Sequence, residues 1–205
     1  EYYEKYTKNT LLDYTISPSS GFDNLKENLG QISNKGYEVT LRLMPYRNIE
    51  KEAYWNVMFT AGHNKSKIEK ISNALKAQNE ITMNKVEGRP LPRYESGYSQ
   101  TMIWAVRSRG IDPATGREIF LMRNGETTDT WKAEEQVPVG DTEPKLSGSV
   151  STSFSYMGFS LNVAASYRFG GDVYNYTLID KIENADLHQN VDRRALRGRW
   201  KEEGD

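Results

Sequence analysis

The chain has 205 residues, a net charge of −1 and a mean hydropathy of −0.76. The balanced charge gives no basic footprint for nucleic acid, and the absence of any run of about 18 apolar residues excludes a membrane-spanning helix while permitting the alternating strands of a membrane barrel. The chain contains no cysteine, so disulfides, thiolate metal sites and cysteine nucleophiles are excluded.

Apolar and polar residues alternate in the N-terminal part of the chain, as they do in β-strands. Residues 2–16 predict a first strand, and a turn-forming loop follows at 17–21. Residues 37–44 and 55–62 alternate more clearly. The short connection at 48–52 joins these two segments, which predicts a hairpin.

The segment 63–83 allows two interpretations. Ile68, Ile71 and Leu75 are spaced by three and four residues, as in a helical turn, but Ile68 and Ile71 also fit a frayed continuation of the preceding strand. We expect a strand end followed by a loop. Residues 84–98 contain two prolines and two glycines and predict an irregular connection.

The middle of the chain contains two turn signals. A strand that is apolar on both faces is predicted around residues 101–107, and Asp112 to Gly116 then predict a turn with the glycine in the left-handed conformation. A calcium loop is the alternative for this turn, but acidic residues at alternate positions are missing. Asn124-Gly125 predicts a hairpin between the segments that flank it.

The clearest pattern in the chain is the hairpin from Leu146 to Phe169. Even positions up to Tyr156 are mostly apolar, every odd position between them is serine, and the alternation resumes after Met157-Gly158. A two-residue turn would pair Tyr156 with Phe159 and Leu146 with Phe169. The register is therefore fixed by the sequence.

Each strand of this hairpin runs about eleven residues, and aromatic residues lie near both ends of its apolar stripe. A transmembrane barrel strand needs about 9–11 residues, with aromatic girdles at both interfaces. A soluble antiparallel sheet with one wet face shows the same alternation. Connections that alternate between long and short favour an outer-membrane barrel, with Met157-Gly158 facing the periplasm and residues 110–116 and 199–205 outside the cell.

Five segments occur in order along the chain: NLGQISNKGYEVTL (28–41), WNVMFTAGHNKSKI (55–68), GIDPATG (110–116), VGDTEPKLSGSVSTSFSYMGFSLNVAASYRFGGDVYN (139–175) and RWKEEGD (199–205). In this order they resemble the C-terminal barrel region of SusC/RagA-type TonB-dependent outer-membrane transporters. The departures are small: Met157 replaces the lysine of the family's YKGF turn, Ser147-Gly148 replaces a double glycine, and Glu203 stands where proline is usual.

The resemblance implies an all-β fold: a segment of an antiparallel transmembrane β-barrel of about 22 strands, with long extracellular loops. Residues 1–205 would lie within the barrel domain and supply about six strands, without the plug domain or the TonB box. The implied function is TonB-dependent import of oligosaccharides or peptides across the bacterial outer membrane, with a SusD-like lipoprotein as partner. A soluble β-sandwich for binding or adhesion is the alternative. The start without methionine or signal peptide and the loop-like end predict a piece of a longer protein.

His63 and His188 have no Asp or Ser residues nearby that could form a catalytic site with them. The carboxylate pairs Glu126 with Asp129 and Glu134 with Glu135 lack the apolar pocket that a general acid needs, so we expect no enzyme, cofactor or metal site. Aromatic and basic residues in loops and at strand ends are the candidates for contact with substrate or partner, against the alternative of girdle or loop packing: Tyr94, Tyr98, Trp104, Arg107 and Trp131, with Arg93 nearby. The serines of the hairpin are expected to face the lumen, where small side chains leave room for a plug: Ser147, Ser149, Ser151, Ser153 and Ser155.

Overall fold

The computed structural model describes residues 1–15, 24–83, 93–183, 185–186, 188, 190–195, 197 and 199–204. These residues form two compact units. The sheet unit comprises residues 1–72, 95–101 and 141–172, and the second unit comprises 73–94, 102–140 and 173–205. The loop predicted at 17–21 lies outside the described residues. In the part of the chain that is described, no helix is long and apolar enough to cross a membrane.

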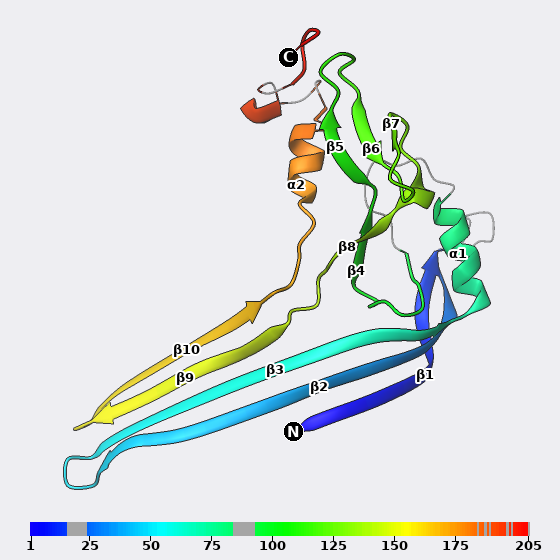
Figure 1. Cartoon of the computed structure of the whole chain (residues 1–205). Helices are drawn as coiled ribbons and strands as arrows, with labels where there is room; N and C mark the ends of the chain where they lie inside the picture. Colours follow the sequence, from blue (N-terminus) through cyan, green and yellow to red (C-terminus); the bar gives the residue numbers. More distant parts are fainter. Residues whose placement is uncertain are drawn as a thin grey trace. The chain divides into compact units, whose positions relative to one another are not determined.

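The sheet unit is one five-stranded antiparallel sheet with the order β1-β2-β3-β9-β10 (Figure 1). Its strands are β1 (Tyr2–Thr15), β2 (Asn24–Asn48), β3 (Ala53–Ile71), β9 (Leu146–Tyr156) and β10 (Phe159–Phe169). The predicted hairpins at 37–62 and 146–169 are both present. Because β9 pairs with β3 as well as with β10, the two hairpins form a continuous sheet.

The register predicted for β9 and β10 is confirmed over the whole hairpin, from Tyr156 opposite Phe159 to Leu146 opposite Phe169. Met157 and Gly158 both have positive φ, 46° and 85°, which is the conformation of a two-residue turn whose twist matches the strands. The other edge of β9 pairs with β3 from Ser155 opposite Tyr54 to Ser147 opposite Gly62.

Strands β2 and β3 are longer than their alternation predicts. Past Gly62, where the pairing of β3 with β9 ends, β2 and β3 still pair with each other from Tyr37 opposite His63 to Gly30 opposite Ile71. In this part the other edge of β2 pairs with β1. Register shifts occur at one level in both ladders, after Lys8 in β1 and after Gln31 in β2. Gly30 lies at this level with φ of 116°, and a Cβ atom there would overlap the carbonyl oxygen of Lys70.

The expected loop after β3 is wrong, because residues Asn73–Met83 form helix α1. Leu75 and Asn79 are its buried residues, one turn apart on the same face. The three-and-four spacing of Ile68, Ile71 and Leu75 therefore spans the end of a strand and the start of a helix. Ile68 itself is fully buried within β3.

The second unit combines α1 with short strands and helical turns. Strands β4 (Met102–Ala105) and β8 (Val137–Asp141) form a two-stranded sheet, and β5 (Arg107–Ile111), β6 (Glu118–Leu121) and β7 (Thr127–Thr128) form a three-stranded one. The helical turns are η2 (Ala133–Glu135), α2 (Tyr176–Leu178), η3 (Ile179–Glu183) and η4 (Arg193–Ala195). The strand predicted at 101–107 is thus divided between β4 and β5.

Both turns predicted in the second unit are confirmed. Gly116 and Gly125 have positive φ, 69° and 90°, and the Gly125 turn joins β6 to β7. In the first turn the Gly116 N–H donates to the Asp112 carbonyl oxygen at 2.8 Å. The Asp112 carboxylate accepts hydrogen bonds from the Thr115 hydroxyl and the Ala114 N–H, which lower its pKa.

A two-faced sheet as the candidate functional site

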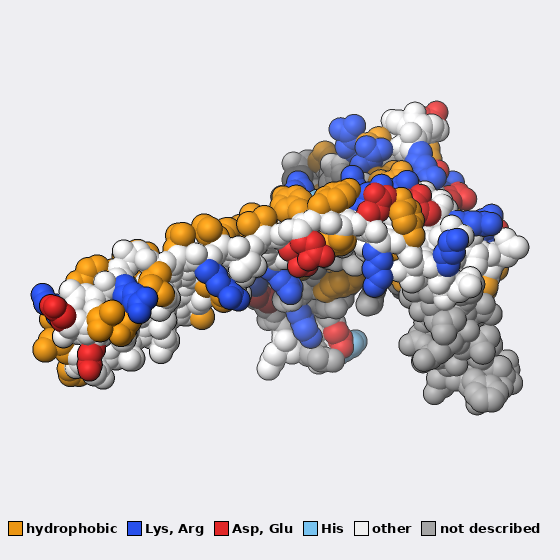
Figure 2. Space-filling model, turned by 90° about the horizontal axis from the view of Figure 1, so that it is seen from below, with side chains coloured by type: hydrophobic (Ala, Val, Ile, Leu, Met, Phe, Trp, Pro, Cys, Tyr) orange, Lys and Arg blue, Asp and Glu red, His pale blue; other side chains and the backbone are white. Residues whose placement is uncertain are grey.

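One face of the sheet carries apolar side chains in rows that cross β2, β3, β9 and β10. Because the registers are continuous, each row joins one residue from each strand: Leu41, Phe59, Val150 and Ala165; Leu43, Val57, Thr152 and Val163; Tyr46, Trp55, Phe154 and Leu161. Apart from half-buried Val57, the larger side chains of these rows are exposed, from 37% for Phe59 to 60% for Leu161. Hydrophobic side chains follow the sheet in Figure 2. A sandwich would bury such a face against a second sheet, whereas a membrane barrel presents it to lipid.

Aromatic side chains lie at both ends of this apolar face. Tyr156 and Phe159 flank the Met157-Gly158 turn. At the other end the rings of Phe59, Tyr167 and Phe169 stack in series, with centroids 6.0 Å and 5.4 Å apart. The strand length of eleven residues in β9 and β10 matches the hydrocarbon thickness between two such belts.

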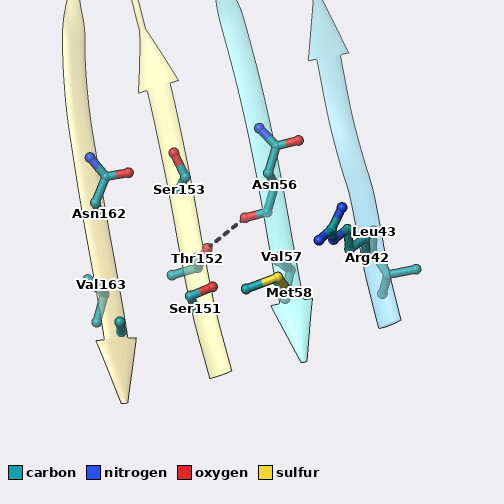
Figure 3. Close-up of a pocket in the computed structure, with 11 residues that line it drawn as sticks. Arg42, Leu43, Asn56, Val57, Met58, Ser151, Thr152, Ser153, Asn162 and Val163 are labelled. Carbon is teal, nitrogen blue, oxygen red and sulfur yellow. Dashed lines mark hydrogen bonds between the residues drawn. The ribbon is translucent and has the colours of Figure 1, made fainter. Parts of the chain in front are cut away.

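The opposite face is polar and built from small side chains. All five serines of β9 that were singled out from the sequence lie on it, because they alternate with the apolar residues. The Ser149 and Thr60 hydroxyl oxygens are 2.8 Å apart across the strands. A pocket of about 410 Å³ is lined by Arg42, Asn56, Met58, Ser151, Ser153 and Asn162 of this face, together with Leu43, Val57, Thr152, Val163 and Ala164. Figure 3 shows how these side chains lie on the four neighbouring strands.

Two tyrosines cross the sheet over glycines. Tyr167 in β10 pairs with Gly148 in β9, and its hydroxyl passes over the glycine to donate to the Thr60 carbonyl oxygen in β3 at 2.7 Å. Tyr3 in β1 pairs with Gly36 in β2 and reaches the Asn64 side-chain oxygen in β3 at 3.0 Å. A Cβ atom would lie 2.6 Å from the tyrosine hydroxyl at either glycine. Each tyrosine therefore connects three strands because its partner has no side chain.

The edge of β3 beyond β9 is covered by two loop segments of the same unit. The Glu143 carboxylate accepts hydrogen bonds from the Ser66 N–H at 3.0 Å and from the Asn64 side-chain amide, and His63 Nδ1 is 2.7 Å from the Lys145 carbonyl oxygen. Further along, the Ile68 N–H donates to the Tyr98 carbonyl oxygen at 2.8 Å. These contacts pair backbone groups that would otherwise form an open edge.

Comparison with known proteins identifies relatives of the chain's sequence. The chain is 26% identical to TonB-dependent receptor P3 of Formosa agariphila over 204 residues, which cover 88% of the chain and 19% of the relative. It is 24% identical to TonB-dependent receptor P39 of the same organism over 243 residues, which cover 99% of the chain and 23% of the relative. The chain thus spans about a fifth of the length of these curated relatives. No protein-family model matches it.

Solved structures with a similar fold are also found. The RagAB peptide transporter superposes with a TM-score of 0.62 at 21% identity, over 83% of the chain and 18% of that protein. The open-open state of the RagAB peptide importer superposes with a TM-score of 0.58 at 23% identity, again over 83% of the chain. The chain is thus similar in sequence to TonB-dependent receptors and has the fold of a segment of the RagAB transporter. Its antiparallel sheet matches part of a barrel and has five strands among the described residues, where the sequence led us to expect about six.

Two of the five segments that carry the sequence resemblance contact each other in the second unit. The Trp200 indole N–H donates to the Pro113 carbonyl oxygen at 2.8 Å, and the Gly204 N–H donates to the same oxygen at 3.0 Å. A Cβ atom on Gly116 would lie 2.5 Å from the Trp200 ring. GIDPATG and RWKEEGD thus form one structure, in which the tryptophan covers a turn that must contain glycine.

Gly116→Ala is expected to detach the C-terminal segment from this turn, because the new methyl group would occupy the position of the Trp200 ring and the alanine would need φ of 69°. Hydrogen exchange of the full-length protein measures this as faster exchange of the Gly204 amide. Gly125→Ala is the matched control, since it has φ of 90° and nothing within 4 Å of its Cβ position. If the two variants show the same exchange at Gly204, the contact does not hold the segment.

The five residues expected to contact substrate or partner are distributed over both units. Tyr98 belongs to the sheet unit, and the other four belong to the second unit. Trp104 is only 2% exposed and lies beneath the Arg93 guanidinium, 5.0 Å from its centre. The Tyr94 backbone is held by the Asn79 side chain, and burial raises the pKa of its hydroxyl. Arg107 is exposed and Trp131 half-buried.

The carboxylates considered and set aside from the sequence take part in loop structure. Asp129 forms an ion pair with Arg117 at 2.7 Å, which lowers the pKa of the carboxylate, and Glu135 accepts a hydrogen bond from the Arg123 N–H. Within the described ranges, no group of three or more histidine or acidic side chains could hold a metal ion. Only the β9 serines of the polar face were singled out from the sequence. Arg42, the contact of Tyr167 across Gly148, and the contact of Trp200 with Gly116 were not.

Proposed function

We propose that this chain is part of an outer-membrane importer that is energised by TonB and takes up oligosaccharides or peptides together with a SusD-like surface lipoprotein. The two-faced sheet carries the proposal. Its apolar face is exposed over strands of membrane length between two groups of aromatic residues, and its other face is lined with small polar side chains. A sheet with these faces separates lipid from an aqueous passage.

In this arrangement residues 1–205 lie within the barrel domain, and the β9 serines line the lumen. The Met157-Gly158 turn faces the periplasm, and residues 110–116 and 199–205 lie outside the cell. The candidates for contact with the substrate or the lipoprotein are the exposed and half-buried residues Tyr94, Arg107 and Trp131, with Tyr98 of the sheet unit. Trp104, being buried, would support such a surface from below. The likeness to RagAB, described as a peptide transporter, supports the peptide class of substrate.

Uptake in the native bacterium tests the function. We expect cells with the full-length gene to accumulate labelled oligopeptides or oligosaccharides, and the accumulation to stop when the gene, TonB or the adjacent lipoprotein gene is deleted. Complementation with the intact gene should restore it. Accumulation that persists after deletion of TonB would contradict a TonB-dependent importer. Accumulation that persists after deletion of the lipoprotein gene would contradict the lipoprotein as partner.

Ser151→Leu tests which face lines the passage. Ser151 lines the pocket on the polar face, so the leucine should narrow the passage and reduce uptake while the protein inserts normally. Val150→Leu, at the neighbouring position on the apolar face, is the matched control and should leave uptake unchanged. Uptake by Ser151→Leu at the wild-type rate, with equal amounts of folded protein in the outer membrane, would contradict a lumen-facing Ser151.

A further inference from the structure

Arg42 is a charged side chain at the middle of the polar face. It belongs to a row of four residues on neighbouring strands, and Ser151 lies at the centre of β9. The row is Arg42 in β2, Met58 in β3, Ser151 in β9 and Ala164 in β10. Around this row, the segments 40–44, 56–60, 149–153 and 162–166 contain no other charged residue. In a barrel, this row lies near the midplane of the membrane, equally far from both ends of the hairpin.

A charge at this depth is costly and is retained where it faces a water-filled passage and has a function there. Among the side chains that the structure describes, no carboxylate forms an ion pair with Arg42. In the sheet unit Lys35 pairs with Glu4 and Lys67 with Glu69, whereas the described side chains form no such pair with Arg47 or Arg168. The partner of Arg42 is therefore to be sought outside the described part of the chain.

The surroundings of Arg42 indicate the chemistry of that partner. Guanidinium groups bind carboxylates in a planar, two-pronged geometry. The pocket beside Arg42 adds the side-chain amides of Asn56 and Asn162 and the hydroxyls of Ser151 and Ser153, which both donate and accept hydrogen bonds. Such a lining suits the amides of a peptide or the hydroxyls of a sugar. Met58 supplies an adaptable apolar wall.

We propose that Arg42 is a specificity-determining residue that selects solutes carrying a carboxylate as they pass along the polar face. This inference rests on the proposed import function and narrows it to acidic substrates. The pocket would bind the carboxylate at Arg42 and the neighbouring amides or hydroxyls of the same solute at the asparagines and serines. Acidic peptides and acidic oligosaccharides share this chemistry.

Competing uptake of matched acidic and neutral probes tests the inference in cells that carry the full-length transporter. The probes are a pentapeptide with one glutamate and its glutamine counterpart, and trigalacturonate and its methyl ester. Arg42→Gln is expected to lower uptake of an acidic probe relative to its neutral counterpart by about tenfold or more, since a charged hydrogen bond is lost. Arg42→Lys should retain part of the preference. The pair of probes that responds identifies the source of the carboxylate.

Arg168→Gln is the matched control, because Arg168 lies on the same face opposite Ser147, at the end of the hairpin; its acidic-to-neutral ratio should not change. Equal loss of both probes in Arg42→Gln, or no loss of either, would overturn the inference. A third result would also overturn it: the variant becomes more sensitive to a large antibiotic such as vancomycin while its acidic-to-neutral uptake ratio stays unchanged. The barrel would then leak because Arg42 had lost an ion pair with a carboxylate of the transporter itself. If the wild-type protein takes up acidic and neutral probes equally and uptake depends on TonB, the inference is overturned and the proposed function stands. If the wild-type protein takes up none of the probes, both are overturned.

Discussion

Val163→Arg is expected to prevent assembly of the barrel, and Asn162→Arg, one residue away, is expected to leave assembly intact. Val163 is 51% exposed on the apolar face, in the row formed with Leu43, Val57 and Thr152 near the centre of the strands. Arginine on the lipid side of a barrel costs about 2–4 kcal/mol at the midplane. Asn162 lies opposite Ser153 on the polar face, where a guanidinium remains in water.

The measurement is the amount of folded full-length transporter in outer-membrane fractions, read from its altered mobility on unheated gels. Leu161→Arg, nearer the turn, should assemble better than Val163→Arg, because the cost falls toward the membrane surface. Two results would contradict the assignment of the faces: normal assembly of Val163→Arg, or failure of Asn162→Arg with assembly of Val163→Arg.

Gly148→Ala is expected to destabilise the sheet by about 2–4 kcal/mol, the sum of an overpacked contact and a lost hydrogen bond. The methyl group would overlap the Thr60 carbonyl oxygen and lie 2.6 Å from the Tyr167 hydroxyl. Tyr167 would then leave its position across the glycine, and its hydrogen bond to Thr60 and its stacking with Phe59 and Phe169 would be lost. Three strands would lose their common contact.

Urea unfolding of the full-length transporter in lipid vesicles, followed by tryptophan fluorescence, measures this change. Gly62→Ala is the control, because its Cβ position has no neighbour closer than 3.8 Å, and stability should be unchanged or slightly higher. Tyr167→Phe removes the hydrogen bond alone and should cost about 1 kcal/mol. Equal stability of the Gly148 and Gly62 variants would show that Tyr167 does not need the glycine.

The sequence predicts the hairpin of β9 and β10 in full, because strict alternation and a two-residue turn leave one register. It predicts the lengths of β2 and β3 poorly. The parts of these strands before Tyr37 in β2 and after His63 in β3 are mostly polar. Backbone hydrogen bonds maintain the pairing there, and the side chains do not alternate between apolar and polar. Helix α1 was missed for a related reason: Ile68 and Ile71 belong to the strand, so only Leu75 and Asn79 remained to indicate a buried helical face.

The site was predictable only where it follows alternation. The serines of β9 were assigned to the polar face because their spacing is strict, whereas Arg42 lies in an ordinary strand, and its importance depends on Met58, Ser151 and Ala164 in neighbouring strands. The contact of Trp200 with Gly116 joins segments far apart in the chain, so no spacing encodes it. The burial of Trp104 likewise depends on Arg93 packing over its ring.

The paired irregularities near Gly30 have a consequence for how the long strands align during folding. A strand that is polar on both faces can slip along its neighbour without burying the wrong side chains, so its alignment is weakly specified. Here Asn9 adopts φ of 56° in β1, Gly30 adopts 116° in β2, and both ladders shift at this level. A slipped β2 would place a residue with a side chain where only glycine avoids the Lys70 carbonyl oxygen. Misaligned pairings of these strands are therefore excluded by the backbone itself, in the region where side-chain pattern could not exclude them.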